Sequence, residues 1–101
     1  MSAIDIKMTK LKGYFGSPAI IVTTENIELI QQHSPKTGYE LKASEFKFIN
    51  YDACTVKINE SKQIYFPAGT VFYVNKDTQE EIYSFIVVEA DIRINYIGYV
   101  N

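Results

Sequence analysis

Residues 39–58 read YELKASEFKFINYDACTVKI and decide the fold class of this chain. Apolar side chains alternate with polar ones in three short runs. The runs are Tyr39/Leu41/Ala43, Phe46/Phe48 and Cys54/Val56/Ile58. Because successive side chains of a strand point to opposite faces, each run predicts a half-buried strand. Three such strands in quick succession favour antiparallel pairing.

Toward the C-terminus the chain continues as short apolar runs between turn formers. Residues 64–66 and 71–74 flank the turn residues 67–70 (PAGT), which predicts a meander of hairpins. Residues 82–88 (IYSFIVV) are apolar on both faces, as in a central strand between two layers. Residues 92–96 (IRINY) alternate again and predict a last strand.

Toward the N-terminus the pattern is more broken. Residues 4–8 (IDIKM) alternate and predict a strand. Residues 13–18 (GYFGSP) are rich in glycine and proline and predict a loop, which leads into a short strand over residues 19–22. Residues 33–38 (HSPKTG) concentrate turn formers and predict an exposed loop.

One segment, residues 24–33, has two interpretations. Thr24 can cap a short helix that contains Ile27 and Ile30, whereas Ile27 and Leu29 alternate as in a strand. We favour the strand and keep the helix as the alternative.

About eight short strands with turn signals roughly every eight to twelve residues are typical of a β-sandwich or a small closed barrel. At 101 residues the chain has the common size of one domain with one core. We therefore predict an all-β fold in which residues 1–101 form a single compact antiparallel β-sandwich, or a small barrel, with at most one short helix.

Charge and cysteine content exclude several classes of partner. The net charge is −2 and the two signs are interspersed, so no cation cluster is present to bind the phosphates of a nucleic acid. No window has the apolar length of a signal peptide or a membrane span, so we expect no membrane partner. The lone Cys54 cannot form an internal disulfide, and we expect a buried thiol in a protein made in the cytosol.

The sequence offers little material for catalysis or metal binding. His33 is the only histidine, and beside Ser34 it is expected to be a solvated loop residue, not the base of a nucleophile relay. One Cys and one His are too few for a zinc or iron site. We therefore expect no catalytic residue, no cofactor and no metal ligand.

Three further motifs have simple structural interpretations. Residues 66–70 (FPAGT) resemble a turn of cupin barrels, but Phe72 and Tyr73 stand where a metal-binding cupin has histidines. The acidic pairs Glu80-Glu81 and Glu89/Asp91 are expected to be solvated turns. Residues 13–17 lack the spacing of a phosphate-binding loop.

Tyrosine is abundant, and its side chain suits positions that are half in water. The eight are Tyr14, Tyr39, Tyr51, Tyr65, Tyr73, Tyr83, Tyr96 and Tyr99. Some of these rings are candidates for a protein interface or a carbohydrate-binding platform, while the structural alternative is packing across strands. The exposed edges of such a sheet are also sites where neighbouring chains add.

From Phe46 onward the chain resembles small structural proteins of tailed bacteriophages. The residues that carry the resemblance are Cys54, Val56, Ile58, Asn59, Pro67, Gly69, Ile82, Ser84, Ile86, Glu89, Tyr96 and Gly98. The resemblance covers roughly the C-terminal half. It implies a compact β-sandwich in the head, neck, tail or baseplate of the particle, and it brings no active-site residues.

These observations lead to one functional expectation and one alternative. We expect a non-enzymatic virion structural protein, made in the host cytoplasm, that forms homo-oligomers and contacts other virion proteins. The alternative is a carbohydrate or host-surface binding module, in which exposed tyrosines stack on sugar rings.

Overall fold

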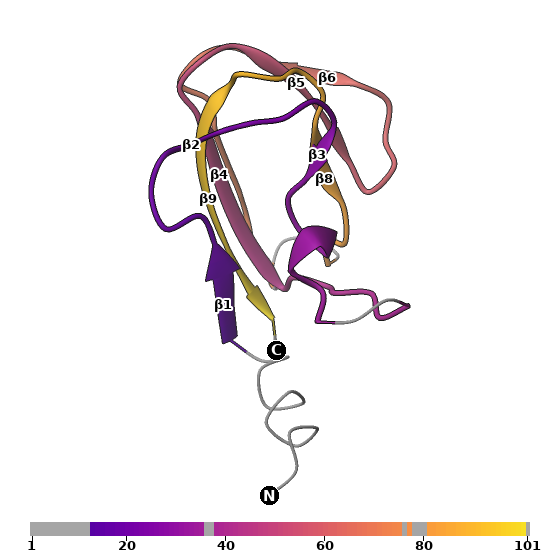
Figure 1. Ribbon diagram of the computed structural model, residues 1–101. Coiled ribbons are helices and arrows are strands. Elements are labelled where there is room, and N and C mark those ends of the chain that lie inside the picture. The colour runs from indigo at the N-terminus through magenta and orange to yellow at the C-terminus, as the bar shows by residue number, and fades with distance from the viewer. Residues whose placement is uncertain (1–12, 36–37, 76, 78–80, 101) are drawn as a thin grey trace, which may run out of the picture.

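The computed structural model describes residues 13–35, 38–75, 77 and 81–100. This part of the chain contains nine strands and one 3-10 turn, η1 (Gln31–His33). The strands are β1 (Gly13–Gly16), β2 (Ile21–Val22), β3 (Ile27–Glu28), β4 (Glu45–Asn50), β5 (Cys54–Ile58), β6 (Ile64–Phe66), β7 (Val71–Val74), β8 (Phe85–Val87) and β9 (Arg93–Val100). Two antiparallel sheets enclose one apolar core, so the predicted all-β sandwich is confirmed (Figure 1).

One sheet has five strands in the order β1-β9-β4-β7, with β2 also paired to β9. The other has four strands in the order β3-β8-β5-β6. Figure 1 shows the two sheets as opposite walls, with β9 and β4 in one and β3 and β8 in the other. The chain therefore crosses between walls several times.

The predicted meander is wrong. The strands β4 and β5 lie in different sheets, as do β6 and β7, and among the described strands only β5 and β6 form a hairpin between chain neighbours. The turns at residues 51–53 and 67–70 carry the chain across the core instead of back along the same sheet. Alternation determines which face of a strand is buried, but it does not determine the strand's partner.

The predicted strand over residues 39–43 is also wrong, because only Ala43 forms a ladder contact, a bridge to Ile82. At Leu41 a side chain takes the place of a neighbouring strand. The Gln31 amide donates to the Leu41 carbonyl (2.8 Å) and accepts from the Leu41 N–H (3.0 Å). Both backbone groups of this buried residue are thus satisfied without a sheet partner.

The predicted loop at residues 13–16 is instead strand β1, paired along its whole length with β9. Glycine permits this pairing at its end, because a Cβ on Gly16 would lie only 2.9 Å from the Ile97 Cα. Ser17 then closes the strand, since its N–H donates to the Tyr96 carbonyl at 3.0 Å. The strand expected over residues 19–22 is reduced to β2.

The remaining sequence predictions are correct only in part. In residues 24–33 the favoured strand is present as the two-residue β3, which includes Ile27. The alternative helix with Ile27 and Ile30 does not form, and the 3-10 turn η1 begins only after Ile30. The central strand expected over residues 82–88 is shorter, but β8 does lie between β3 and β5. The strand predicted over residues 4–8 lies outside the described residues.

The core is built from aromatic rings that meet between the sheets. Phe48 of β4 and Phe85 of β8 are fully buried, with ring centroids 4.6 Å apart. Phe46 adds a second contact to Phe85 at 5.0 Å. Tilted rings at these distances stabilise a core by about 0.5–1.5 kcal/mol per pair beyond the burial of their area.

Candidate functional site

The outward face of the five-stranded sheet carries a row of apolar side chains. Register places Tyr14 of β1 opposite Tyr99, Ile97 of β9 opposite Lys47, and Lys47 opposite Tyr73 of β7. Large parts of these side chains are exposed: 75% of Tyr14, 55% of Tyr73 and 47% of Ile97. We use the name outer-face patch for these outward-facing residues together with Val71, which is 55% exposed. The patch consists of Tyr14, Lys47, Val71, Tyr73, Ile97 and Tyr99.

The alternation of the strands explains why these residues point outward. Phe46 and Phe48 of β4 face the core, so Lys47 between them faces solvent. Its ladder partners Ile97 and Tyr73 necessarily lie on the same face. The sheet therefore presents apolar rings and aliphatic groups where an isolated antiparallel sheet usually carries polar residues.

A shallow hollow of about 90 Å³ lies within this patch. Tyr14 and Tyr99, with ring centroids 4.9 Å apart, line it together with Tyr73, Glu45 and Lys47 among others. Sites for small molecules usually enclose roughly 300–1,000 Å³ and bury most of the ligand. This hollow fits a protruding side chain or one face of a small ring better than an enclosed substrate.

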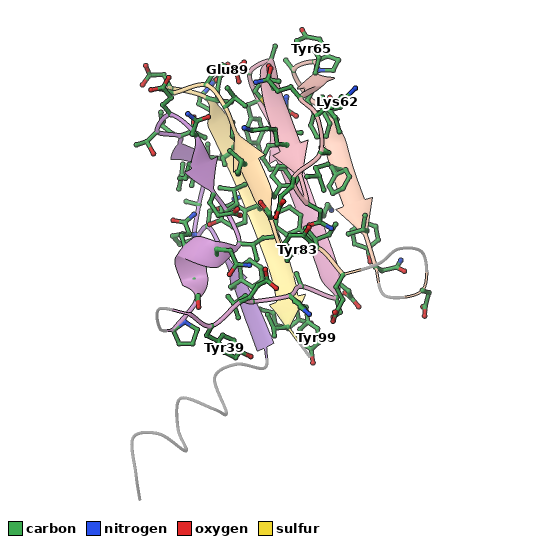
Figure 2. All side chains as sticks on the ribbon, turned by 90° about the vertical axis from the view of Figure 1, so that its right-hand side faces the viewer. Tyr39, Lys62, Tyr65, Tyr83, Glu89 and Tyr99 are labelled. Carbon is green, nitrogen blue, oxygen red and sulfur yellow. The ribbon has the colours of Figure 1, made fainter. Side chains whose placement is uncertain are left out.

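The eight tyrosines divide into three groups. Tyr14, Tyr51, Tyr65 and Tyr73 are exposed, Tyr39, Tyr83 and Tyr99 are half-buried, and Tyr96 is buried. Figure 2 shows Tyr65 and Tyr99 at opposite ends of the molecule, so the rings do not form a single platform. Of the tyrosines named from sequence, Tyr14, Tyr73 and Tyr99 line one hollow together.

His33 is not the solvated loop residue expected from sequence. Its ring is half-buried, contacts Phe15 at a centroid distance of 5.1 Å, and places Nε2 2.6 Å from the Tyr96 hydroxyl oxygen. Burial lowers the pKa of His33 and raises the pKa of Tyr96 to about 12. The 3-10 turn η1, which follows the sandwich strand β3, is the element that turns this side chain inward.

Cys54 is buried, as the sequence suggested, and is reduced. Burial raises the pKa of its thiol to about 11, and the nearby charges of Glu89 and Asp52 act in the same direction. A nucleophilic cysteine needs the opposite shift, because the thiolate is the reactive form. The geometry of Cys54 is that of a core residue.

The carboxylates with defined partners mostly bind backbone. Glu28 accepts hydrogen bonds from the N–H groups of Ile30 and Phe85, both at 3.0 Å. Glu89, expected to be a solvated turn residue, instead accepts from the N–H and the hydroxyl of Thr55 at 2.8 and 2.6 Å. Both carboxylates thus fix loop residues to the four-stranded sheet, and their role is structural. Glu80 lies outside the described residues.

One ion pair links the loop after β4 to the first residue of β9, at the end of the five-stranded sheet. The guanidinium of Arg93 donates to both carboxylate oxygens of Asp52, with Nη2 2.8 Å from Oδ1. Hydrogen bonding from Arg93 lowers the pKa of Asp52 to about 2. The pair is exposed, so it fixes loop geometry more than it stabilises the fold.

In the described part of the chain, no three His, Cys, Asp or Glu side chains converge as a metal site would require. Within the same residues, no helix has the length and hydropathy to cross a bilayer. Comparison of the chain with protein-family models, with curated proteins and with solved structures finds no match.

Sequence reasoning missed Ile97, Val71 and Lys47 as members of the outer-face patch. The alternation of residues 45–48 already predicted that the side chain of Lys47 points away from the core, on the other face of the strand from Phe46 and Phe48. The missing information was the pairing, because Ile97 and Tyr73 become its neighbours only through the ladders from β4 to β9 and β7.

Proposed function

We propose that this protein is a non-enzymatic structural protein that assembles through its outer-face patch, and specifically a virion component of a tailed bacteriophage. The observation that carries the proposal is the apolar outer face of the five-stranded sheet. Tyr14, Tyr73 and Ile97 expose about half of their surface or more. Soluble monomers rarely expose contiguous apolar patches of this kind, and such patches mark sites of interaction.

Burial of this patch against another chain would be favourable. Removal of apolar area from water stabilises a contact by about 25 cal/mol per Å². Tyrosine is among the residues enriched at interface centres, since it brings a large ring with few rotatable bonds and a polar tip. The shallow hollow beside Tyr99 offers a receptor for one protruding side chain.

The phage assignment is supported by the resemblance of residues 46–101 to small virion proteins. Several of the residues that carry the resemblance lie in the core or in turns of the fold. Cys54 and Val56 are buried in β5, and Gly69, with a φ of +83°, sits in the turn between β6 and β7. A family defined by a sandwich and its turns, and not by an active site, is consistent with a role in assembly.

Analytical ultracentrifugation over a wide range of concentration tests the assembly function. We expect reversible association of the wild-type chain, and much weaker association of the double variant Tyr14→Lys/Ile97→Lys, which places charges on the outer face. Tyr65→Lys is the matched control, because Tyr65 is exposed on the other sheet. A chain that stays monomeric, alone and with virion proteins from the same source, would contradict the proposal.

Mass spectrometry and antibody labelling of purified phage particles from the source test the virion assignment separately. The chain should be present at a fixed copy number per particle. Its absence from particles, together with assembly in solution, would leave the structural role and remove the phage assignment.

A carbohydrate-binding role is the second candidate, favoured by one observation. Tyr14, Tyr73 and Tyr99 surround a hollow that Glu45 and Lys47 also line, so rings for stacking lie beside groups that bind hydroxyls. A glycan array distinguishes this role from assembly. Binding that Tyr14→Ala abolishes would favour the carbohydrate site, whereas an array without signal would exclude the glycans that it displays.

A further inference from the structure

Strand β7 is the last strand of the five-stranded sheet, seen as the pale orange strand at the right-hand side of Figure 2. It pairs with β4 on one side, and no described strand pairs with its other side. Its sequence, Val71-Phe72-Tyr73-Val74, contains neither a charge nor a proline. Natural edge strands usually carry such protection against pairing with other chains.

The hydrogen bonds of the ladder show which residues of β7 point to its open side. The Asn50 N–H donates to the Thr70 carbonyl at 3.4 Å, and bonded and non-bonded pairs alternate along an antiparallel ladder. Phe72 and Val74 therefore direct their backbone groups toward β4. Val71 and Tyr73 direct theirs away from it.

The other side of β4 agrees with this assignment. The Tyr51 N–H donates to the Arg93 carbonyl at 2.8 Å, so odd-numbered residues along this strand bond toward β9 and even-numbered residues toward β7. Two residues of β7, Val71 and Tyr73, thus present two donors and two acceptors at the edge.

We propose that β7 of a second copy of this chain occupies that edge, antiparallel to the first, with a two-fold axis at Phe72. This inference deepens the assembly function proposed above and rests on it. In this register Val71 of each copy lies opposite Tyr73 of the other. All four edge groups of each copy then find partners, and side chains of which 55% is exposed in the isolated chain pack against one another.

Charge also favours a second copy as the occupant. The pairing brings uncharged strands together, and Lys47 is the charged ladder partner of β7. The two Lys47 residues would lie about 16 Å apart, because three strand spacings of roughly 4.8 Å and an offset of two residues along the strands separate them. That separation exceeds the Debye length of about 8 Å at physiological ionic strength, so their repulsion is screened.

The contact between the two edge strands is small, so we expect the dimer to be weak. Two four-residue strands bury much less than the roughly 1,200 Å² of a stable interface. Edge pairing alone therefore gives a weak dimer, reinforced where neighbouring subunits hold copies close together. The product is one continuous sheet of ten strands whose outer-face patches lie side by side.

Disulfide trapping tests this register. Val71→Cys and Tyr73→Cys are prepared as separate proteins and mixed at high concentration under mild oxidation. We expect a disulfide-linked dimer in the mixture and little in either variant alone, because only residues 71 and 73 face each other at the separation of about 5.5 Å that a disulfide accepts. Cys54 is buried and does not compete.

A mixture of Val71→Cys with Tyr65→Cys is the control, since Tyr65 lies on the other sheet and is at least as accessible as Tyr73. Trapping in the control at the same rate, or no trapping in the mixture of Val71→Cys and Tyr73→Cys, would overturn the proposal. Each variant's circular dichroism spectrum establishes that it is folded.

The same experiments separate this inference from the proposed function. If the chain associates but is not trapped through residues 71 and 73, and Tyr14→Lys/Ile97→Lys abolishes association, assembly uses the face and the edge inference fails alone. If the wild-type chain does not associate with itself or with virion proteins, both fail.

Discussion

His33 and Tyr96 are joined by a short hydrogen bond, with 2.6 Å between the imidazole Nε2 and the phenolic oxygen. Gln32 also donates to the Tyr96 oxygen, at 3.2 Å. The phenol can accept from Gln32 and donate to His33 only when the imidazole is neutral. The turn η1 is thereby tied to β9 by a contact that depends on the protonation state of His33.

We expect the burial of His33 to make stability depend on pH. An unfolded histidine titrates near 6.5, and burial lowers the pKa of His33 in the folded chain. Between these two values the unfolded state binds more protons, so the free energy of unfolding is largest above pH 6.5 and decreases as the pH falls. Urea unfolding between pH 8 and pH 5 measures it. The variant His33→Gln should lose this part of the pH dependence, and an unchanged profile would contradict the prediction.

Asn50 at the end of β4 holds the two sheets together by its side chain. It is fully buried, and its Nδ2 donates to the carbonyls of Asp52 and Pro67, both at 2.9 Å, and of Phe66 at 3.2 Å. We expect Asn50→Ala to lower the free energy of unfolding by about 1–3 kcal/mol, because these three carbonyls, of which the Phe66 carbonyl is buried, lose their donor. Asn50→Asp should cost more at neutral pH, since it directs a carboxylate at carbonyl oxygens.

Chemical denaturation measures both Asn50 variants. Asn95→Ala is the matched control, because Asn95 lies on the outward face of β9 opposite Ile49 and should change stability by less than about 0.5 kcal/mol. Equal effects at positions 50 and 95 would contradict the role assigned to Asn50.

Gly98 leaves room for the ring of Phe15, its ladder partner on β1. A Cβ at position 98 would overlap Cζ and Cε1 of that ring. Gly98→Ala should therefore destabilise the fold by about 1–3 kcal/mol. Because the strain depends on Phe15, the double variant with Phe15→Leu should be more stable than the sum of the single effects predicts, by about 0.5–3 kcal/mol.

A double-mutant cycle of unfolding free energies tests the coupling between Gly98 and Phe15. The same cycle with Phe72→Leu is the control, since the ring of Phe72 packs against Phe66 and Phe85, whereas the nearest atoms to a Cβ at Gly98 belong to Phe15. Additive effects of Gly98→Ala and Phe15→Leu would show that the overlap is relieved in another way.

Cys54 should report opening of the core. Burial raises the pKa of its thiol to about 11, so both access and thiolate content are low in the folded chain. We expect Ellman's reagent to react with native Cys54 far more slowly than with the exposed thiol that the substitution Tyr65→Cys introduces, and urea to remove the difference. Fast reaction of Cys54 in the native chain would contradict the burial of β5.

Two of the three strands predicted in the deciding segment were located correctly from sequence. Phe46 and Phe48 mark β4, and Cys54 and Val56 mark β5, because each pair needs one buried face whatever its partner is. The expected partner was wrong, since a turn at residues 51–53 can either reverse within a sheet or cross to the other. Local sequence does not distinguish these two paths.

The errors elsewhere share one cause. Gly13 and Gly16 favour a loop by their own propensity, yet contact with β9 makes them ends of a strand. Leu41 alternates like a strand residue, yet the Gln31 amide satisfies its backbone. His33 lies in a turn-rich segment, yet η1 directs it onto Tyr96. In each case a residue distant in sequence overrides the local preference.

For the candidate site, the sequence supplied the residue types and the structure supplied the surface. The count of tyrosines was visible in the chain alone, as was the two-layered β class, because alternation requires a buried and an open face. Only the tertiary structure decided that Tyr14, Ile97 and Tyr73 share the open face and that β7 lies at an edge. Both depend on hydrogen bonds between strands far apart in sequence, which no local pattern encodes.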